Sequence, residues 1–274
     1  MIRVAFLGND RWSVPTLRAL DEAHDVEVTL VVTNPPRPAG RGSEPRATSV
    51  AVEARGRGLP LLEVAGVRSG EGLEALRRGD ADAFVVVAYG ELLLAEVLDL
   101  PRLGSVNVHF SVLPRWRGAA PVQRAILEGD ERTGVTVMVM DEGMDTGPIL
   151  ATVEVPIVDD EDAGALGARL AELGAPLLVE SLRRFEAGAI APRPQEHGAA
   201  TYAPKLTAAD RPIEWSSRSD TIVRRVRALA PAPGALTTFR GLPLKILRAV
   251  DRGPRGYVVA DHEHTLAEIH VMPG

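Results

Sequence analysis

The chain has 274 residues, of which 45% are hydrophobic and 25% are charged, and its formal net charge is −6. These values are those of an ordinary globular protein, and no segment approaches the roughly 20 apolar residues of a membrane helix, so we expect no membrane partner. The chain has no cysteine, which excludes disulfides, thiolate metal sites and a cysteine nucleophile. Because the N-terminus carries no export signal either, we expect a cytoplasmic protein.

Short apolar strands alternate with helical segments along most of the chain, which is the order typical of a parallel sheet covered by helices. The expected strands are Ile2–Leu7, Val26–Thr33, Pro60–Glu63, Ala83–Ala88, Gly104–His109, Val135–Val139 and Ile149–Pro156. The expected helices are Val14–Ala23, Thr48–Gly56, Glu71–Arg78, Leu92–Leu98, Ala119–Glu128 and Asp162–Ala187. A long proline-rich loop is expected at residues 34–45. The sequence therefore predicts an α/β domain over residues 1–190.

The pattern changes after the last of these helices. Four prolines lie between Ala191 and Ile213 and break any regular element, so we expect a linker at residues 191–212. A helix is expected at Ser219–Ala230, and the strand-like pieces that follow it are Ala235–Phe239, Leu244–Ala249, Tyr257–Ala260 and Leu266–Val271. Short strands separated by glycine and proline predict a small β module over residues 213–274.

Charge is distributed unevenly between these regions. From Lys205 to Gly274 the chain has 11 basic and 7 acidic residues, whereas the remainder is acidic on balance. The basic segment could meet a polyanion, or the charges could simply be scattered over the surface. Composition alone favours scattered surface charge.

The end of the strand at 104–109 carries the most informative side chains. Alternation along a strand places Asn107 and His109 on one face, whereas Val106 and Val108 point into a core. In open α/β sheets, ligands bind at the carboxyl ends of the strands. An amide and an imidazole side by side at such a position indicate a catalytic strand end.

A carboxylate in the polar turn at residues 141–147 completes the candidate group. Transfer of an acyl group to an amine needs donors for an oxyanion, which Asn107 and a protonated His109 could supply. It also needs a group that takes the proton of the attacking ammonium, for which Asp145 is suited. The alternative interpretation is a capping Asn, a core His bonded to backbone and a turn Asp, and the residues alone do not separate the two.

Other catalytic motifs are weaker. The turn Gly8–Arg11 follows the first strand but lacks the G-x-G-x-x-G pattern, which disfavours a nicotinamide dehydrogenase, and no G-x-x-x-x-G-K-[ST] phosphate loop occurs. Ser111 lies near His109, but the G-x-S-x-G pattern of a serine hydrolase is absent.

Two further groups have open or ordinary explanations. His262, His264 and His270 are better explained as solvated surface residues than as metal ligands, so we expect no metal site. Arg115 and Arg117 are either solvated loop charges or contacts for an anion, and the sequence does not decide.

The run Asn107–Pro121 closely resembles the signature loop of the methionyl-tRNA formyltransferase family, a branch of the folate-dependent formyltransferases. The other segments that resemble this family are 37–42, 85–90, 123–126, 134–136, 140–147 and 201–206. The Asn-x-His loop and the downstream Asp are shared by all folate-dependent formyltransferases and indicate the reaction class. The insertion Arg37–Gly42 and the continuation Arg117–Pro121 are what indicate the tRNA branch.

The resemblance implies a Rossmann-like, parallel-sheet formyltransferase domain followed by a small β-barrel domain. It also implies transfer of the formyl group of 10-formyltetrahydrofolate to the amino group of methionyl initiator tRNA by direct attack of the amine, without a metal. Asn107, His109 and Asp145 would be catalytic. The chain stops at Gly274, before the family's second domain usually ends, so we expect either an incomplete barrel or a truncated product.

The same resemblance implies binding residues, and we expect a monomer. The residues that would contact folate are Ser111, Val112, Leu113, Pro114, Tyr89 and Gly90. The residues that would contact tRNA are Arg37, Arg41 and Lys205. Two departures from the family concern the turn Gly8–Trp12, where the family has Gly-Thr-Pro-x-Phe, and Ser43–Pro45, where the family is rich in lysine.

Two other functions remain open from the sequence. The first is a folate-dependent formyltransferase that acts on an amino sugar or a nucleotide sugar. The second is a catalytically impaired protein that binds tRNA or folate. Assays with charged initiator tRNA and with amino sugars separate these functions.

Overall fold

The computed structural model describes residues 1–38, 44–249, 257–262 and 265–270, the last two ranges by their backbone alone. Contacts divide the chain into two compact units. Unit 1 comprises Met1–Arg117, Gly134–Val153 and Leu170–Thr201, and unit 2 comprises Gly118–Thr133, Glu154–Arg169 and Tyr202–Gly274. Asn107, His109 and Asp145 all lie in unit 1.

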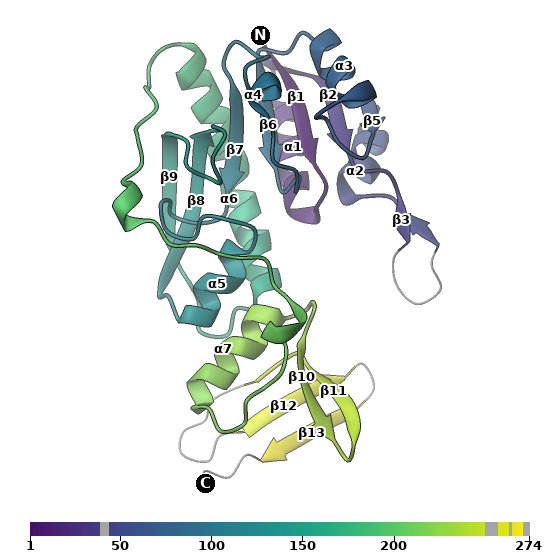
Figure 1. The fold of residues 1–274 in the computed structure, drawn as a ribbon, viewed down its shortest axis with the longest axis vertical. Helices are drawn as coiled ribbons and strands as arrows, with labels where there is room; N and C mark the ends of the chain where they lie inside the picture. The colour runs from purple at the N-terminus through teal and green to yellow at the C-terminus, as the bar shows by residue number, and fades with distance from the viewer. Residues whose placement is uncertain (39–43, 250–256, 263–264, 271–274) are drawn as a thin grey trace. The chain divides into compact units, whose positions relative to one another are not determined.

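A mostly parallel sheet positions these residues (Figure 1). Its strands are β1 (Ile2–Gly8), β2 (Val26–Thr33), β5 (Leu61–Glu63), β6 (Ala83–Val87), β7 (Ser105–His109), β8 (Arg132–Val139) and β9 (Ile149–Pro156). Their order is β5-β2-β1-β6-β7-β8-β9, with the first five parallel and β8 antiparallel to β7. The α/β class predicted from the sequence is confirmed.

Helices cover both faces of this sheet. They are α1 (Val14–Glu22), α2 (Ser49–Arg57), α3 (Gly70–Arg78), α4 (Ala95–Leu98) and the unit 1 part of α6 (Ala163–Glu186), whereas α5 (Pro121–Glu128) belongs to unit 2. Within unit 1, α6 approaches the sheet closely at Gly174, where a Cβ would lie 2.9 Å from Cγ1 of Val108 and 3.1 Å from Cγ1 of Val135. Val108 therefore faces α6, and its neighbours Asn107 and His109 face the other side.

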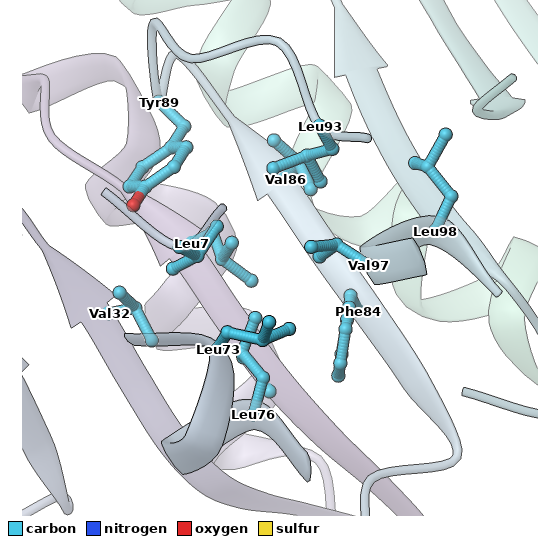
Figure 2. Close-up of a cluster of buried hydrophobic side chains, with 12 residues drawn as sticks. Leu7, Val32, Leu73, Leu76, Phe84, Val86, Tyr89, Leu93, Val97 and Leu98 are labelled. Atoms are coloured by element: carbon cyan, nitrogen blue, oxygen red, sulfur yellow. The ribbon is translucent and has the colours of Figure 1, made fainter. Parts of the chain in front are cut away.

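A hydrophobic core fills that other side (Figure 2). Its labelled members are Leu7, Val32, Leu73, Leu76, Phe84, Val86, Tyr89, Leu93, Val97 and Leu98. Leu73 and Leu76 come from α3, and Val97 and Leu98 from α4. This packing fixes the sheet beneath the loop that follows β6.

Asn9 ties three loops together at the carboxyl edge of the sheet. Its Nδ2 donates to the carbonyl oxygen of Tyr89, beyond β6. Its Oδ1 accepts from Oγ1 of Thr33 at 2.8 Å and from the N–H of Asn34 at 2.7 Å. The turn in which the sequence departs from the family that it resembles is therefore built around an amide that serves β1, β2 and β6 at once.

Besides α5, unit 2 contains a further helix and two antiparallel hairpins. These elements are α7 (Ser219–Leu229), β10 (Ala235–Phe239) with β11 (Leu242–Ile246), and β12 (Tyr257–His262) with β13 (Thr265–His270). One apolar cluster joins α7 to the first hairpin through Ile222, Val226, Ala235 and Ile246. A small C-terminal domain is thus present.

The first hairpin differs from its prediction. The strand expected at Leu244–Ala249 lies at Leu242–Ile246. The reason is that Arg240 and Gly241 have positive φ values of 50° and 78°. They form a two-residue turn directly after Phe239, and such turns start the returning strand at once.

Two further segments differ from the sequence expectation. The helix expected at Leu92–Leu98 is shortened to α4, because Leu94 is extended, with φ −82° and ψ 157°. The expected loop at 34–45 contains two short paired strands, β3 (Arg37–Pro38) and β4 (Pro45–Arg46). Of the helices that the structure describes, none has both the length and the apolar character to cross a bilayer.

Candidate active site

His109 ends β7 and has a partner at each ring nitrogen. Its Nε2 lies 2.8 Å from the carbonyl oxygen of Trp116, and its Nδ1 lies 3.7 Å from Oδ2 of Asp145. A carbonyl oxygen only accepts hydrogen bonds, so Nε2 must carry a hydrogen. Nδ1 is therefore the nitrogen that can gain or lose a proton, and it faces the carboxylate. The side chain is 7% exposed.

Asp145 reaches His109 through a turn that folds back along β7. Because β8 is antiparallel, its last residue Val139 pairs with Val106, near the start of β7. The turn requires close backbone approach at Gly147, where a Cβ would lie 1.8 Å from the carbonyl oxygen of Val139. Asp145 itself has φ 53°, a left-handed conformation that few residues other than glycine adopt. The carboxylate is aimed by this unusual turn.

Asn107 lies on the same face of β7 as His109. Its Nδ2 donates to the carbonyl oxygen of Val86 at 3.0 Å, and this acceptor sets the orientation of the amide. A second N–H remains on the same nitrogen. Within the described residues, the buried Oδ1 of Asn107 meets no hydrogen-bond donor. A buried acceptor of this kind costs about 1–3 kcal/mol.

The loop after β7 is anchored to the sheet by Thr136. Its Oγ1 donates to the carbonyl oxygen of Ser111 at 2.7 Å and accepts from the N–H of Leu113 at 3.1 Å. The hydroxyl of Ser111 donates to the carbonyl oxygen of Arg115 at 2.6 Å, so it is committed within the loop. Ser111 and Leu113 are buried, whereas Val112 and Pro114 are half-buried.

Thr201 clamps the far end of this loop. Its Oγ1 accepts from the N–H of Trp116 at 2.9 Å, and its carbonyl oxygen accepts from the N–H of Arg117 at 2.9 Å. Trp116 has φ 63°, and its carbonyl oxygen is the one that meets His109. Thr201 thus supports the acceptor that sets the tautomer of the His109 imidazole.

The two loop arginines have different environments. Arg115 is exposed, and its guanidinium lies 4.5 Å from the centroid of the Trp116 ring, a cation–π contact. Arg117 is only 2% exposed, so it is not a solvated charge. Its guanidinium contacts Gln195 and His197.

In the Tyr89–Gly90 turn, main-chain groups are accessible to a ligand, whereas the phenol of Tyr89 is not. The Tyr89 ring is 4% exposed and belongs to the core in Figure 2. Burial, together with the nearby Glu91 carboxylate, raises the pKa of the Tyr89 phenol, which stays protonated. Gly90 is exposed and has φ 82°. Any ligand contact here is made by main-chain groups around Gly90.

The residues expected to contact tRNA belong to different units of the chain. Arg37 is exposed on β3 in unit 1, and Lys205 is exposed in unit 2. Arg41 lies outside the described residues.

The candidate site has no cluster of metal ligands among the described residues. In the part of the chain that the structure describes, no three His, Cys, Asp or Glu residues come together to hold a metal ion. The side chains of His262, His264 and His270 lie outside that part.

Sequence reasoning missed three contributors to the site. Gln195 and Thr201 fall in the segment expected to be a linker, and Trp116 contributes through its carbonyl oxygen, which carries no sequence signal. The only available hint was the resemblance of residues 201–206 to the family.

The arrangement is suited to acyl transfer without a covalent enzyme intermediate. Asn107 offers an N–H donor, His109 offers Nδ1, and Asp145 offers a carboxylate near that nitrogen. These are a donor for an oxyanion, a proton-carrying ring and an acceptor for an amine proton. No hydroxyl among them is placed as a nucleophile.

Most of the chain matches one family. Residues 2–182 match the family described as Formyl transferase, and residues 205–267 match Formyl transferase, C-terminal domain. A methionyl-tRNA formyltransferase from Thermus thermophilus is 44% identical over 284 residues, covering 99% of this chain and 92% of that protein. Another of the same name from Halorhodospira halophila is 49% identical over 249 residues, covering 90% and 79%.

Solved structures agree on the fold. An N-formyltransferase from Helicobacter canadensis, crystallised with folinic acid and dTDP-3-aminofucose, has a TM-score of 0.70 and 18% identity, covering 99% of this chain and 96% of that one. Glycinamide ribonucleotide transformylase 1 from Symbiobacterium toebii has a TM-score of 0.60 and 22% identity, covering 71% and 93%. By its family matches and its curated relatives, this chain belongs to the formyl transferase family.

Proposed function

We propose that this chain transfers the formyl group of 10-formyltetrahydrofolate to the amino group of methionyl initiator tRNA. The observation that carries the proposal is the approach of Nδ1 of His109 to the Asp145 carboxylate at 3.7 Å, beside the Asn107 amide. The substrate follows from the curated relatives, which are named methionyl-tRNA formyltransferase at 44–49% identity. The folate donor follows from the family, and solved relatives hold folinic acid or tetrahydrofolic acid.

The reaction needs one bond to form and one to break. The methionyl nitrogen attacks the formyl carbon, and the carbonyl electron pair moves onto the formyl oxygen. Asn107 donates an N–H to that oxygen, and a protonated Nδ1 of His109 donates a second hydrogen bond. Asp145 takes the ammonium proton, directly or through a water. The intermediate then expels N10 of tetrahydrofolate, which takes up a proton, and N-formylmethionyl-tRNA is the other product.

Asn107 contributes one group to this scheme. The N–H that does not bind the Val86 carbonyl meets the oxyanion. Val112, Pro114 and the main chain around Gly90 contribute the folate contacts, because the side chains of Ser111, Leu113 and Tyr89 are buried.

The remaining assignments extend the same proposal. Arg37, Arg41 and Lys205 contact the tRNA, and the strands of the second domain belong to a β-barrel. The domains span residues 1–190 and 213–274, with a linker at 191–212. The protein acts as a monomer in the cytoplasm, where charged tRNA is found, and light scattering tests the monomeric state.

The deciding experiment is formyl transfer to charged initiator tRNA by the 274-residue protein, with and without 10-formyltetrahydrofolate. The Asp145→Asn variant should lower kcat by about 10²–10⁴-fold, the usual range for a general base, while folate binding is retained. Asp99→Asn, at an exposed position after α4, is the matched control. Near-normal turnover by Asp145→Asn contradicts the role of the carboxylate. Transfer to an aminated nucleotide sugar, but not to tRNA, supports the sugar alternative.

A further inference from the structure

Gln195 lies beyond α6, in the segment that the sequence predicted to be a linker, yet it is only 5% exposed. Its Nε2 donates to the carbonyl oxygen of Asp145 at 2.9 Å and to that of Gly147 at 2.7 Å. Its Oε1 accepts from Nε of Arg117 at 3.1 Å and from Nη2 at 2.6 Å. Both hydrogens and both lone pairs of this amide are thus in use.

The chemistry of these partners allows only one orientation of the amide. A guanidinium only donates, so Oε1 must face Arg117, and the two carbonyl oxygens only accept, so Nε2 must face the turn. Arg117 is held in turn, since Nη2 lies 3.2 Å from Nδ1 of His197 and its main-chain N–H donates to Thr201 at 2.9 Å. Gln195 is therefore a fixed support and not a mobile side chain.

The support acts on the unusual part of the turn. A non-glycine residue in the left-handed region costs about 1–3 kcal/mol and persists only where surrounding contacts impose it. Asp145 is such a residue, with φ 53°, and Gln195 binds the carbonyl oxygen of that same residue. Removing the bond would let the peptide relax and would turn the carboxylate away from His109.

We propose that Gln195, oriented by Arg117, is a positioning residue that holds Asp145 in its reactive conformation. The inference rests on the proposed function, because it assigns the purpose of the turn to formyl transfer. Gln195 touches neither substrate nor reacting atoms in this scheme; it acts through Asp145. Arg117 connects the two partners of the His109–Asp145 pair. Its buried guanidinium orients Gln195, which binds Asp145. Arg117 also directly follows Trp116, whose carbonyl oxygen sets the His109 tautomer.

Substitution of Gln195 by Glu isolates this effect. The introduced carboxylate still accepts hydrogen bonds from Arg117. It has no hydrogen to donate, however, and its negative charge repels the carbonyl oxygens of Asp145 and Gly147. We expect Gln195→Glu to lower kcat by about 10–100-fold, as a displacement near 1 Å can do. The KM values for both substrates should stay within about twofold, since ground-state binding is untouched. Glu196→Gln, at the exposed neighbouring position, is the control and should behave as the wild type.

A double-mutant cycle separates positioning from general damage. Because Gln195 acts through Asp145, adding Gln195→Glu to Asp145→Asn should cost little beyond the single Asp145→Asn change, measured in single turnovers. Full additivity of the two effects overturns the inference. If Gln195→Glu does not fold, Arg117→Lys replaces it in the same cycle, because lysine keeps the charge but loses the bidentate grip on Oε1.

A measurement without substrates keeps this inference distinct from the proposed function. Amide hydrogen exchange over residues 143–147 should be about 30-fold faster in Gln195→Glu, the factor that corresponds to the loss of two hydrogen bonds of roughly 1 kcal/mol each. Unchanged exchange overturns the inference whatever the enzyme's substrate is. Failure of the wild-type protein to formylate methionyl-tRNA overturns the proposed function alone.

Discussion

At the scale of single residues, the chemistry depends on which hydrogen each polar group carries. The Trp116 carbonyl assigns the hydrogen of His109 to Nε2 and leaves Nδ1 to face Asp145. The Val86 carbonyl similarly assigns the orientation of the Asn107 amide. Main-chain acceptors thus set the donor pattern before any substrate is bound, which is the preorganisation that oxyanion stabilisation requires.

One residue-scale prediction concerns Asn107. In Asn107→Asp, the N–H that donates to the Val86 carbonyl and the N–H proposed for the oxyanion are both lost, and negative charge is placed where the oxyanion forms. We expect kcat to fall by about 10²–10³-fold, the usual effect of removing one such donor. Folate affinity, measured by calorimetry, should change little, and a melting curve monitors folding. Turnover within a few-fold of the wild type would exclude the oxyanion role.

At the scale of elements, ion pairs join helix α1 to helix α2. Glu53 on α2 accepts from Nε and Nη2 of Arg18 on α1 at 2.7 and 2.8 Å, and from Nε of Arg57 at 2.7 Å. The hydrogen bonds from Arg18 and then from Arg57 lower the pKa of Glu53 from 4.5 to about 2. The folded state therefore prefers the ionised carboxylate.

This preference predicts how stability depends on pH. Because the folded pKa lies below the unfolded value, the contribution is fully present above about pH 4.5 and is lost as the pH falls toward about 2. Glu53→Gln should lower the free energy of unfolding at pH 7 by about 1 kcal/mol or less, as is usual for exposed pairs. The difference from the wild type should shrink in urea titrations at pH 3. Glu27→Gln, on β2, controls for the loss of one negative charge; a difference that grows on acidification contradicts the assignment.

At the scale of the whole molecule, a net charge of −6 means that tRNA must be met by local basic groups. Several arginines of unit 2 are already occupied by main-chain acceptors. Arg211 donates to the carbonyl oxygens of Pro233 and Gly234, and Arg227 donates to those of Val158 and Glu161. The overall basic count of that region therefore overstates what is available to a polyanion.

Exposed Lys205 is the clearest test of the tRNA proposal. Lys205→Ala should weaken binding of methionyl-tRNA and reduce the slope of log K against log salt by about 1, as the loss of one phosphate contact does. Filter binding at several salt concentrations measures both quantities. Arg78→Ala, at an exposed position at the end of α3, is the control for removal of a cation. An unchanged slope in Lys205→Ala removes Lys205 from the interface.

The sequence by itself determined the alternation of strands and helices, because buried parallel strands and amphipathic helices leave periodic apolar patterns. It also placed Asn107 and His109 on one face of a strand, because that follows from a period of two. The shared face and the mostly parallel sheet were therefore accessible without a structure. Strand and helix ends such as those of β11 and α4 were not, because turns and local extended residues decide them.

Only the tertiary structure decided how the site is held. The acceptor that sets the His109 tautomer is the main-chain carbonyl oxygen of Trp116. Its role cannot be predicted from the sequence, because every residue has such an oxygen. Gln195 and Thr201 belong to a proline-rich segment with no periodicity, yet they contact Asp145 and Trp116 across 50 and 85 residues of chain. Such hydrogen bonds depend on the path of the folded backbone, and local sequence preference does not encode that path.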